Sequence, residues 1–100
     1  MALYPDLGGR IALVTGGGRG IGKAIGLVLA AAGADVAINY RARADAAEAT
    51  AAEIRKLGRR TAALRADVSI AGEVRALVEG VEKNFGKIDI LVNNAGISEP

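Results

Sequence analysis

The 100-residue sequence contains no cysteine and no histidine, and both absences exclude classes of chemistry. Without cysteine there is no disulfide framework, no thiol nucleophile and no thiolate ligand for zinc. Without histidine there is no imidazole ligand for zinc and no Ser-His-Asp triad. None of these chemistries is therefore open to the chain.

Aromatic side chains, clustered positive charge and long apolar runs are also scarce. Aromatic residues make up 3% of a sequence that is 51% hydrophobic, and much of that apolar content is alanine. This balance favours helices packed closely on a sheet over a β-sandwich. The net charge is +2 with scattered basic residues, which disfavours a nucleic-acid partner. No apolar run approaches the roughly 18 residues of a membrane span, and the N-terminus lacks a signal-peptide pattern. We therefore expect a cytoplasmic protein without a membrane partner.

Glycine, in contrast, is concentrated in one stretch. Five of the seven residues from 16 to 22 are glycine, directly after the apolar run at residues 11–14. A strand that ends in a glycine-rich turn and opens a helix binds phosphate, because the backbone can approach the anion closely and the helix N-terminus attracts it. A plain strand-to-helix turn is the alternative, but it does not need so many glycines, each of which costs backbone entropy.

The spacing of these glycines selects one version of the dinucleotide fingerprint. The pattern G-x-G-x-x-G fails because Ile21 stands at its last position. The pattern T-G-x-x-x-G-x-G fits, with Thr15, Gly16, Gly20 and Gly22. Gly16 would make the tight turn, Gly20 would permit close approach to a diphosphate, and Gly22 would let the helix pack tightly on the sheet.

A second phosphate-binding pattern overlaps the first. Gly17-x-x-x-x-Gly22-Lys23 is the beginning of a P-loop, G-x-x-x-x-G-K-[ST]. The next residue is Ala24, so the hydroxyl that binds magnesium is missing. A P-loop nucleotide-binding protein is therefore the less favoured alternative, and Lys23 is more simply a solvated lysine.

Apolar periodicity predicts three helices between four short strands. The strands are expected at residues 11–14, 36–38, 61–64 and 88–92. The first helix should bury Ile21, Ala24, Ile25, Val28, Leu29 and Ala32. The second should open with a capping box of Asp45 and Glu48 and bury Ala47, Ala51, Ile54 and Leu57. The third should have Ser69 as its N-cap and bury Ile70, Val74, Leu77, Val78, Val81 and Phe85.

The resulting order is β-α-β-α-β-α-β, which indicates an α/β protein with a parallel, Rossmann-type doubly wound sheet. Numbered along the chain, its strands should lie in the order 3-2-1-4. The chain then reverses direction between strands 1 and 4, and a ligand crevice should form outside their carboxyl ends. The glycine turn and the sequence Asn93-Asn94-Ala95-Gly96 both fall at that place.

Three motifs together resemble the N-terminal half of a classical short-chain dehydrogenase/reductase, of the 3-oxoacyl-carrier-protein reductase kind. They are Thr15-Gly16-x-x-x-Gly20-Ile21-Gly22, Asp67-Val68 after the third strand, and Asn93-Asn94-Ala95-Gly96 after the fourth. The resemblance covers essentially residues 8–98. It implies that residues 1–100 are a partial dinucleotide-binding half-domain of a chain of roughly 250 residues.

The resemblance also implies roles for individual residues. The loop from Gly16 to Ile21, including Gly18 and Arg19, would line the cofactor diphosphate and adenosine ribose. Asp67 would accept a hydrogen bond from the adenine amino group, with Val68 behind the ring. Residues Asn94, Ala95 and Gly96 would run beside the ribose on the nicotinamide side, and Asn93 would brace the fourth strand. The alternatives are a turn aspartate at position 67 and, at 93–94, a turn that satisfies its own backbone.

Charge at the end of the second strand predicts which cofactor binds. An NAD site places a carboxylate there, about 20 residues past the glycines, to bind the ribose 2′-OH. That position is near Tyr40, and no acid lies between residues 36 and 44. Arg41 follows directly and Arg19 lies in the glycine loop, an environment that suits a 2′-phosphate. We therefore expect NADP rather than NAD. Arg43 is either a further phosphate ligand or a solvated loop arginine.

The family's catalytic serine, Tyr-x-x-x-Lys pair and asparagine find no match here. Tyr4 is followed four residues later by Gly8, and Tyr40 by Ala44. The 100 residues alone should be inactive, marginally stable and prone to aggregate through an open fourth strand. The intact parent, a homo-oligomer by resemblance (tetramer or dimer), would transfer hydride between nicotinamide and a small carbonyl or alcohol substrate. A nucleotide-binding module without turnover is the alternative.

Overall fold

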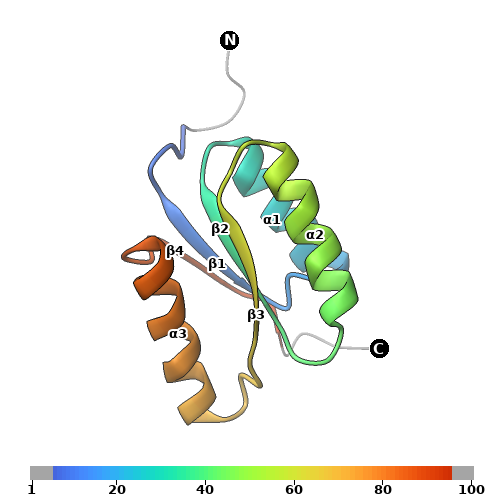
Figure 1. Cartoon of the computed structure of the whole chain (residues 1–100), viewed down its shortest axis with the longest axis vertical. Coiled ribbons are helices and arrows are strands. Elements are labelled where there is room, and N and C mark those ends of the chain that lie inside the picture. Colours follow the sequence, from blue (N-terminus) through green and yellow to red (C-terminus); the bar gives the residue numbers. More distant parts are fainter. Residues whose placement is uncertain (1–5, 96–100) are drawn as a thin grey trace.

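A computed structural model describes residues 6–95 as one sheet with helices on both faces (Figure 1). The elements are β1 (Ile11–Thr15), α1 (Gly20–Ala31), β2 (Asp35–Tyr40), α2 (Ala44–Lys56), β3 (Thr61–Arg65), α3 (Ala71–Phe85) and β4 (Ile90–Asn93). All pairings are parallel, and the strand order is β3-β2-β1-β4. The predicted α/β class, element order and strand order are confirmed.

The two central strands form the core because both of their faces are covered. All of β1 and the four inner residues of β2 are buried. Alternate side chains point to opposite faces of a strand, so one row packs under α1 and α2 and the other under α3. The first row includes Val14 and Ile38, packed with Ile54 of α2. The second includes Leu13, packed with Leu77 and Val81 of α3.

Helix α1 packs on the sheet through its smallest residues. Its buried positions are Gly22, Gly26 and Ala30, which recur every four residues and so share one face. The predicted apolar face was wrong at Ile21 and Val28, which are 64% and 50% exposed, whereas Leu29 packs against the core as predicted. The physical reason is distance: a Cβ on Gly22 would collide with the carbonyl oxygen of Gly16, so only glycine allows this approach.

Helix α2 begins two residues earlier than the predicted capping box requires. Its N-cap is Arg43, which makes no side-chain cap, and Asp45 therefore lies inside the first turn. The capping-box prediction was wrong, because the Asp45 carboxylate binds the guanidinium of Arg43 instead. The buried face includes Ala47, Ala51 and Ile54 as predicted, but it adds Thr50 and leaves Leu57 44% exposed.

Helix α3 begins after Ile70, which is its N-cap, so the predicted cap at Ser69 was wrong. The Ser69 hydroxyl instead donates to the carboxylate of Asp67. Leu77 and Val81 are buried as predicted, whereas Ile70 is 47% exposed because it precedes the helix. In α3, the residues nearest the sheet thus come from the middle of the predicted stripe.

The sheet ends at β4, where Leu91 is 63% exposed. None of the helices in residues 6–95 is long and apolar enough to cross a membrane. In that same part of the chain, no cluster of three acidic side chains could hold a metal ion.

Candidate functional site

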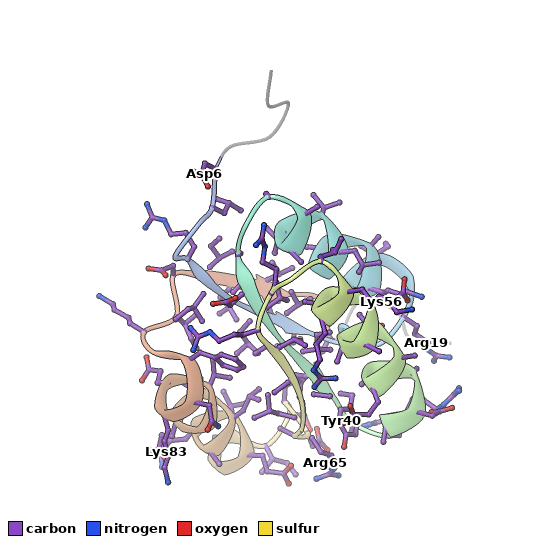
Figure 2. The ribbon with its side chains drawn as sticks, turned by 45° about the horizontal axis from the view of Figure 1, so that its top comes forward. Asp6, Arg19, Tyr40, Lys56, Arg65 and Lys83 are labelled. Atoms are coloured by element: carbon purple, nitrogen blue, oxygen red, sulfur yellow. The ribbon has the colours of Figure 1, made fainter. Side chains whose placement is uncertain are left out.

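A cleft of about 470 Å³ lies at the carboxyl ends of β1, β2 and β3. Tyr40 and Arg65 are neighbours across β2 and β3. Figure 2 shows them at the end of the sheet opposite to Asp6, and it shows Arg19 beside α2. This is the place where the strand order predicted a crevice. The residues that line it are Gly16, Gly18, Arg19, Asn39, Tyr40, Arg41, Ala42, Arg43, Ala46, Ala66, Asp67, Val68, Ser69 and Ala95.

The glycine loop forms one wall of the cleft in a shape that side chains would prevent. Gly16 and Gly20 have φ of 65° and 59°, the left-handed region that favours glycine. A Cβ on Gly18 would lie 3.2 Å from the backbone nitrogen of Ala47, at the start of α2. The loop ends at Arg19, the N-cap of α1, which makes no side-chain cap. The first N–H groups of a helix have no partner within the helix, so this arrangement suits an anion.

The hydroxyl of Thr15 joins the glycine loop to the turn after β4. Its oxygen accepts hydrogen bonds from the backbone N–H groups of Asn94 (2.9 Å) and Ala95 (3.0 Å). The hydroxyl itself lies 3.3 Å from the carbonyl oxygen of Val92 and 3.4 Å from Oδ1 of Asn93, either of which can accept its proton. Asn94 Nδ2 donates to the carbonyl oxygen of Gly16 at 3.1 Å. These bonds connect two predicted motifs that lie about 80 residues apart in the chain.

Asn39, which the sequence did not single out, holds two walls of the cleft together. It is buried, and its Oδ1 accepts from the N–H of Gly16 at 3.4 Å while its carbonyl oxygen accepts from Gly17 at 3.1 Å. Its Nδ2 lies 3.1 Å from the carbonyl oxygen of Ala66 and 3.4 Å from that of Leu64. The available signal was an amide inside a buried strand, where a polar group needs partners.

Asp67 stands on the wall opposite the glycine loop and forms a turn with Ser69. Its Oδ1 accepts from the hydroxyl of Ser69 at 2.6 Å and from the N–H of Ser69 at 3.0 Å. These bonds, together with the charges of Arg41 and Arg65, hold the pKa of the Asp67 carboxyl below its usual range. The turn role, one of the two alternatives for this residue, is therefore present.

The rim over the end of β2 is basic. Arg19, Arg41 and Arg43 all line the cleft, and Asp67 is the one carboxylate among the lining residues that the structure describes. Tyr40 stands at the end of β2, the position where an NAD site would have a carboxylate. The arginines that the sequence analysis grouped around a 2′-phosphate thus line the same cleft.

The structure brings eight of the fifteen predicted site residues to the cleft, and six others do not line it. Gly16, Gly18, Arg19, Tyr40, Arg41, Asp67, Val68 and Ala95 are lining residues. Thr15, Gly20, Ile21, Gly22, Asn93 and Asn94 are not among the lining residues, and Thr15 and Asn94 are buried. Gly96 lies outside the described residues. The sequence missed Asn39, Ala42, Ala46, Ala66 and Ser69 as lining residues.

A parallel sheet in this order, with a glycine loop and a cleft at the carboxyl ends of its strands, defines the first half of a Rossmann-type dinucleotide-binding domain. A family model described as short chain dehydrogenase matches residues 10–100. The chain belongs to the short-chain dehydrogenase family. No comparison supports the P-loop alternative.

Relatives and solved structures give the same family. The chain is 48% identical over 89 residues to the 3-oxoacyl-(acyl-carrier-protein) reductase FabG of Staphylococcus aureus, covering 89% of this chain and 36% of the relative. It is 44% identical over 96 residues to the hydroxynaphthalene reductase arp2 of Aspergillus fumigatus, covering 96% and 35%. A short-chain dehydrogenase from Burkholderia cenocepacia, solved in complex with NADP, is 54% identical with a TM-score of 0.90, covering 94% and 38%. The chain thus spans little more than a third of the length of these proteins.

Proposed function

We propose that the chain is the NADP(H)-binding part of an oxidoreductase that moves hydride between nicotinamide and a carbonyl or alcohol. The observation that carries the proposal is the basic rim, where Arg19 and Arg41 border the cleft beside Tyr40. A guanidinium matches a phosphate with two parallel hydrogen bonds, whereas an NAD site would place a carboxylate at the end of β2. The NADP-bound structure of the Burkholderia cenocepacia relative supports this choice.

The described residues fit a dinucleotide on two independent grounds. The glycine loop opens a helix N-terminus, and its positive φ angles at Gly16 and Gly20 give the backbone a shape that suits close approach to an anion. The cleft volume of about 470 Å³ falls within the range of small-molecule sites, roughly 300–1,000 Å³. Gly16, Gly18 and Arg19 would hold the diphosphate, Asp67 and Val68 the adenine, and Arg19 and Arg41 the 2′-phosphate. Ala95 and the residues around it would lie beside the second ribose.

The chain's own residues bind and orient in this proposal, and they do not move a proton. When bound, the nicotinamide supplies or accepts the hydride. Thr15, Asn39 and Asn94 keep the glycine loop and the turn after β4 in register with each other. The proton donor that the reaction needs is proposed to come from residues outside these 100, because neither Tyr4 nor Tyr40 begins a Tyr-x-x-x-Lys pattern.

The substrate is proposed only by class. A 3-oxoacyl-(acyl-carrier-protein) reductase and a hydroxynaphthalene reductase match this half at 48% and 44% identity, so the half does not separate their substrates. A small carbonyl or alcohol is the common class. Assembly of the intact protein as a dimer or tetramer and a cytoplasmic location both stay predictions.

The test is a set of affinities for NADPH, NADH and Mg-ATP, measured by calorimetry on the full chain. We expect NADPH to bind most tightly and Mg-ATP not to compete. Arg41→Gln should weaken NADPH binding about tenfold or more and leave NADH binding nearly unchanged, because an ionic hydrogen bond to phosphate contributes about 1.5–3 kcal/mol. The control is Arg75→Gln, an exposed arginine on α3. Equal affinity of the wild type for NADPH and NADH would contradict the proposal.

A further inference from the structure

Arg43 lies on the rim in the connection between β2 and α2. It is the N-cap residue of α2 and lines the cleft with its neighbours Arg41, Ala42 and Ala46. A guanidinium at this place is within the same basic rim as Arg19 and Arg41. Its availability to an anion therefore depends on what already binds it.

Asp45 already binds that guanidinium through both of its oxygens. Arg43 Nε lies 3.0 Å from Asp45 Oδ1, and a terminal nitrogen of Arg43 lies 3.0 Å from Oδ2. This two-bond arrangement is one that an arginine uses for a phosphate, so the carboxylate occupies the Nε edge of the guanidinium, one of the two edges that could bind a phosphate with two bonds. The two residues are two positions apart, and their pairing is therefore local.

Asp45 also takes up a donor at the start of α2. The hydrogen bonds from Arg43 and from the backbone N–H of Ala46 lower the pKa of Asp45 to about 2, so its carboxylate is charged at neutral pH. Asp45 itself does not line the cleft, whereas Arg43 and Ala46 do. The Asp45 carboxylate thus binds Arg43 and the N–H of Ala46 from outside the cleft that these two residues line.

We propose that Asp45 is a specificity-determining residue, which competes with the 2′-phosphate of the cofactor for the Arg43 guanidinium. The inference rests on the proposed function, since it concerns the same phosphate. A phosphate at the Nε edge of Arg43 must replace the carboxylate, and a phosphate at the other edge meets a guanidinium whose charge Asp45 already partly neutralises. Arg43 therefore adds less binding free energy for the 2′-phosphate than an unpaired arginine at the same place would. The strength of its pairing with Asp45 determines the size of this reduction.

The test compares 2′,5′-ADP with 5′-AMP, which lacks only the 2′-phosphate. Both affinities are measured by calorimetry on the full chain. Asp45→Asn should bind 2′,5′-ADP about two- to five-fold more tightly, because exposed ion pairs are weak, and should bind 5′-AMP unchanged. Glu48→Gln is the matched control, since it removes the same charge from the same helix at an exposed position. Arg43→Gln should weaken 2′,5′-ADP binding and abolish the gain from Asp45→Asn in the double variant.

Each outcome bears on the inference. An equal gain for 5′-AMP, an equal gain from Glu48→Gln, or a gain that persists in the Arg43→Gln background would overturn it, because each points to general charge instead of competition. A wild type that prefers 2′,5′-ADP together with an unchanged Asp45→Asn variant would overturn the inference and leave the proposed function standing. Equal binding of both ligands by every variant would overturn both. A thermal unfolding transition is recorded for each variant as the control that it is folded.

Discussion

The two ends of the sheet differ in which polar side chains hold the backbone and in whether a cleft lies beside them. At the amino end, the carboxylate of Asp35 accepts from the N–H and Nε of Arg60 at 2.8 and 3.0 Å, and that guanidinium lies 5.4 Å from the ring centre of Phe85. The carboxylate of Asp89 accepts from the N–H of Ile11 at 3.0 Å. Charged groups at this end are paired within the fold.

At the carboxyl end, buried neutral groups brace the glycine loop, and charged groups line the rim, where Arg43 pairs with Asp45. Thr15, Asn39 and Asn94 are buried and hydrogen-bonded beneath the loop. Arg19 and Arg41 border the cleft above them. The difference indicates that one end closes the fold and the other end is shaped for an anion. Changes at the amino end should therefore alter stability alone, and changes at the carboxyl end should alter nucleotide binding as well.

The largest effect is expected at Gly22. Gly22→Ala would push a Cβ into the carbonyl oxygen of Gly16 and to 2.7 Å from Asn94 Nδ2, and should destabilise the fold by about 3 kcal/mol or more. The measurement is the free energy of unfolding in urea. The matched control is Gly72→Ala in α3, whose Cβ would meet nothing within 4 Å and which should gain about 0.5–1 kcal/mol. Equal effects of the two substitutions would contradict the tight crossing of α1.

The next effect concerns Asn39. Asn39→Asp keeps the shape but replaces the donating Nδ2 with an oxygen that faces the carbonyl oxygens of Leu64 and Ala66. We expect a loss of about 2–3 kcal/mol in unfolding free energy and weaker binding of 2′,5′-ADP by the folded fraction. Full affinity in a destabilised variant would show that Asn39 supports the core but does not position the glycine loop.

A smaller effect, confined to stability, is expected at the amino end. Asp35→Ala removes the acceptor of two Arg60 hydrogen bonds and should cost about 1 kcal/mol, as judged by thermal or urea unfolding. The affinity for 2′,5′-ADP should not change, because the cleft lies at the other end of the strands. A clear loss of affinity would break the contrast between the two ends.

The smallest effect is expected at the start of β3, where the hydroxyl of Thr61 is buried without a hydrogen-bond partner among residues 6–95. Thr61→Val keeps the branched shape and removes the unsatisfied oxygen, so we expect a gain of about 0.5–1 kcal/mol in unfolding free energy. A loss of stability would show that this hydroxyl has a partner that the structure does not describe.

The sequence predicted parallel strands because short continuous apolar runs alternate with helical stripes of period 3.6, and a nucleotide-binding half of this kind has the strand order 3-2-1-4. It mispredicted the buried face of α1 for a physical reason. Hydrophobicity selects Ile21 and Val28, but α1 buries Gly22, Gly26 and Ala30, and Gly22 must be glycine because a Cβ there would collide with the carbonyl oxygen of Gly16. Side-chain size at the closest approach, and not polarity, decides that face.

The site was predicted where a motif is local and missed where its partners are remote. The glycine spacing pointed to Gly16, which lines the cleft, and the family resemblance added Gly18 and Arg19, which line it too. Asn39 acts through groups 23 to 27 residues away, which no local pattern reveals. Asp45 has the spacing of a capping box with Glu48, but an arginine two residues before it provides a stronger partner.

The most direct test of the central claim is a titration of the isotopically labelled chain with 2′,5′-ADP, followed by backbone amide chemical shifts. The account predicts shifts centred on the glycine loop at residues 16–22, on residues 40–43 and on residues 67–69. Shifts confined to the groove between α1 and α2, which is lined by Leu27, Val28 and Leu57, would contradict it. So would the absence of any shift at millimolar ligand.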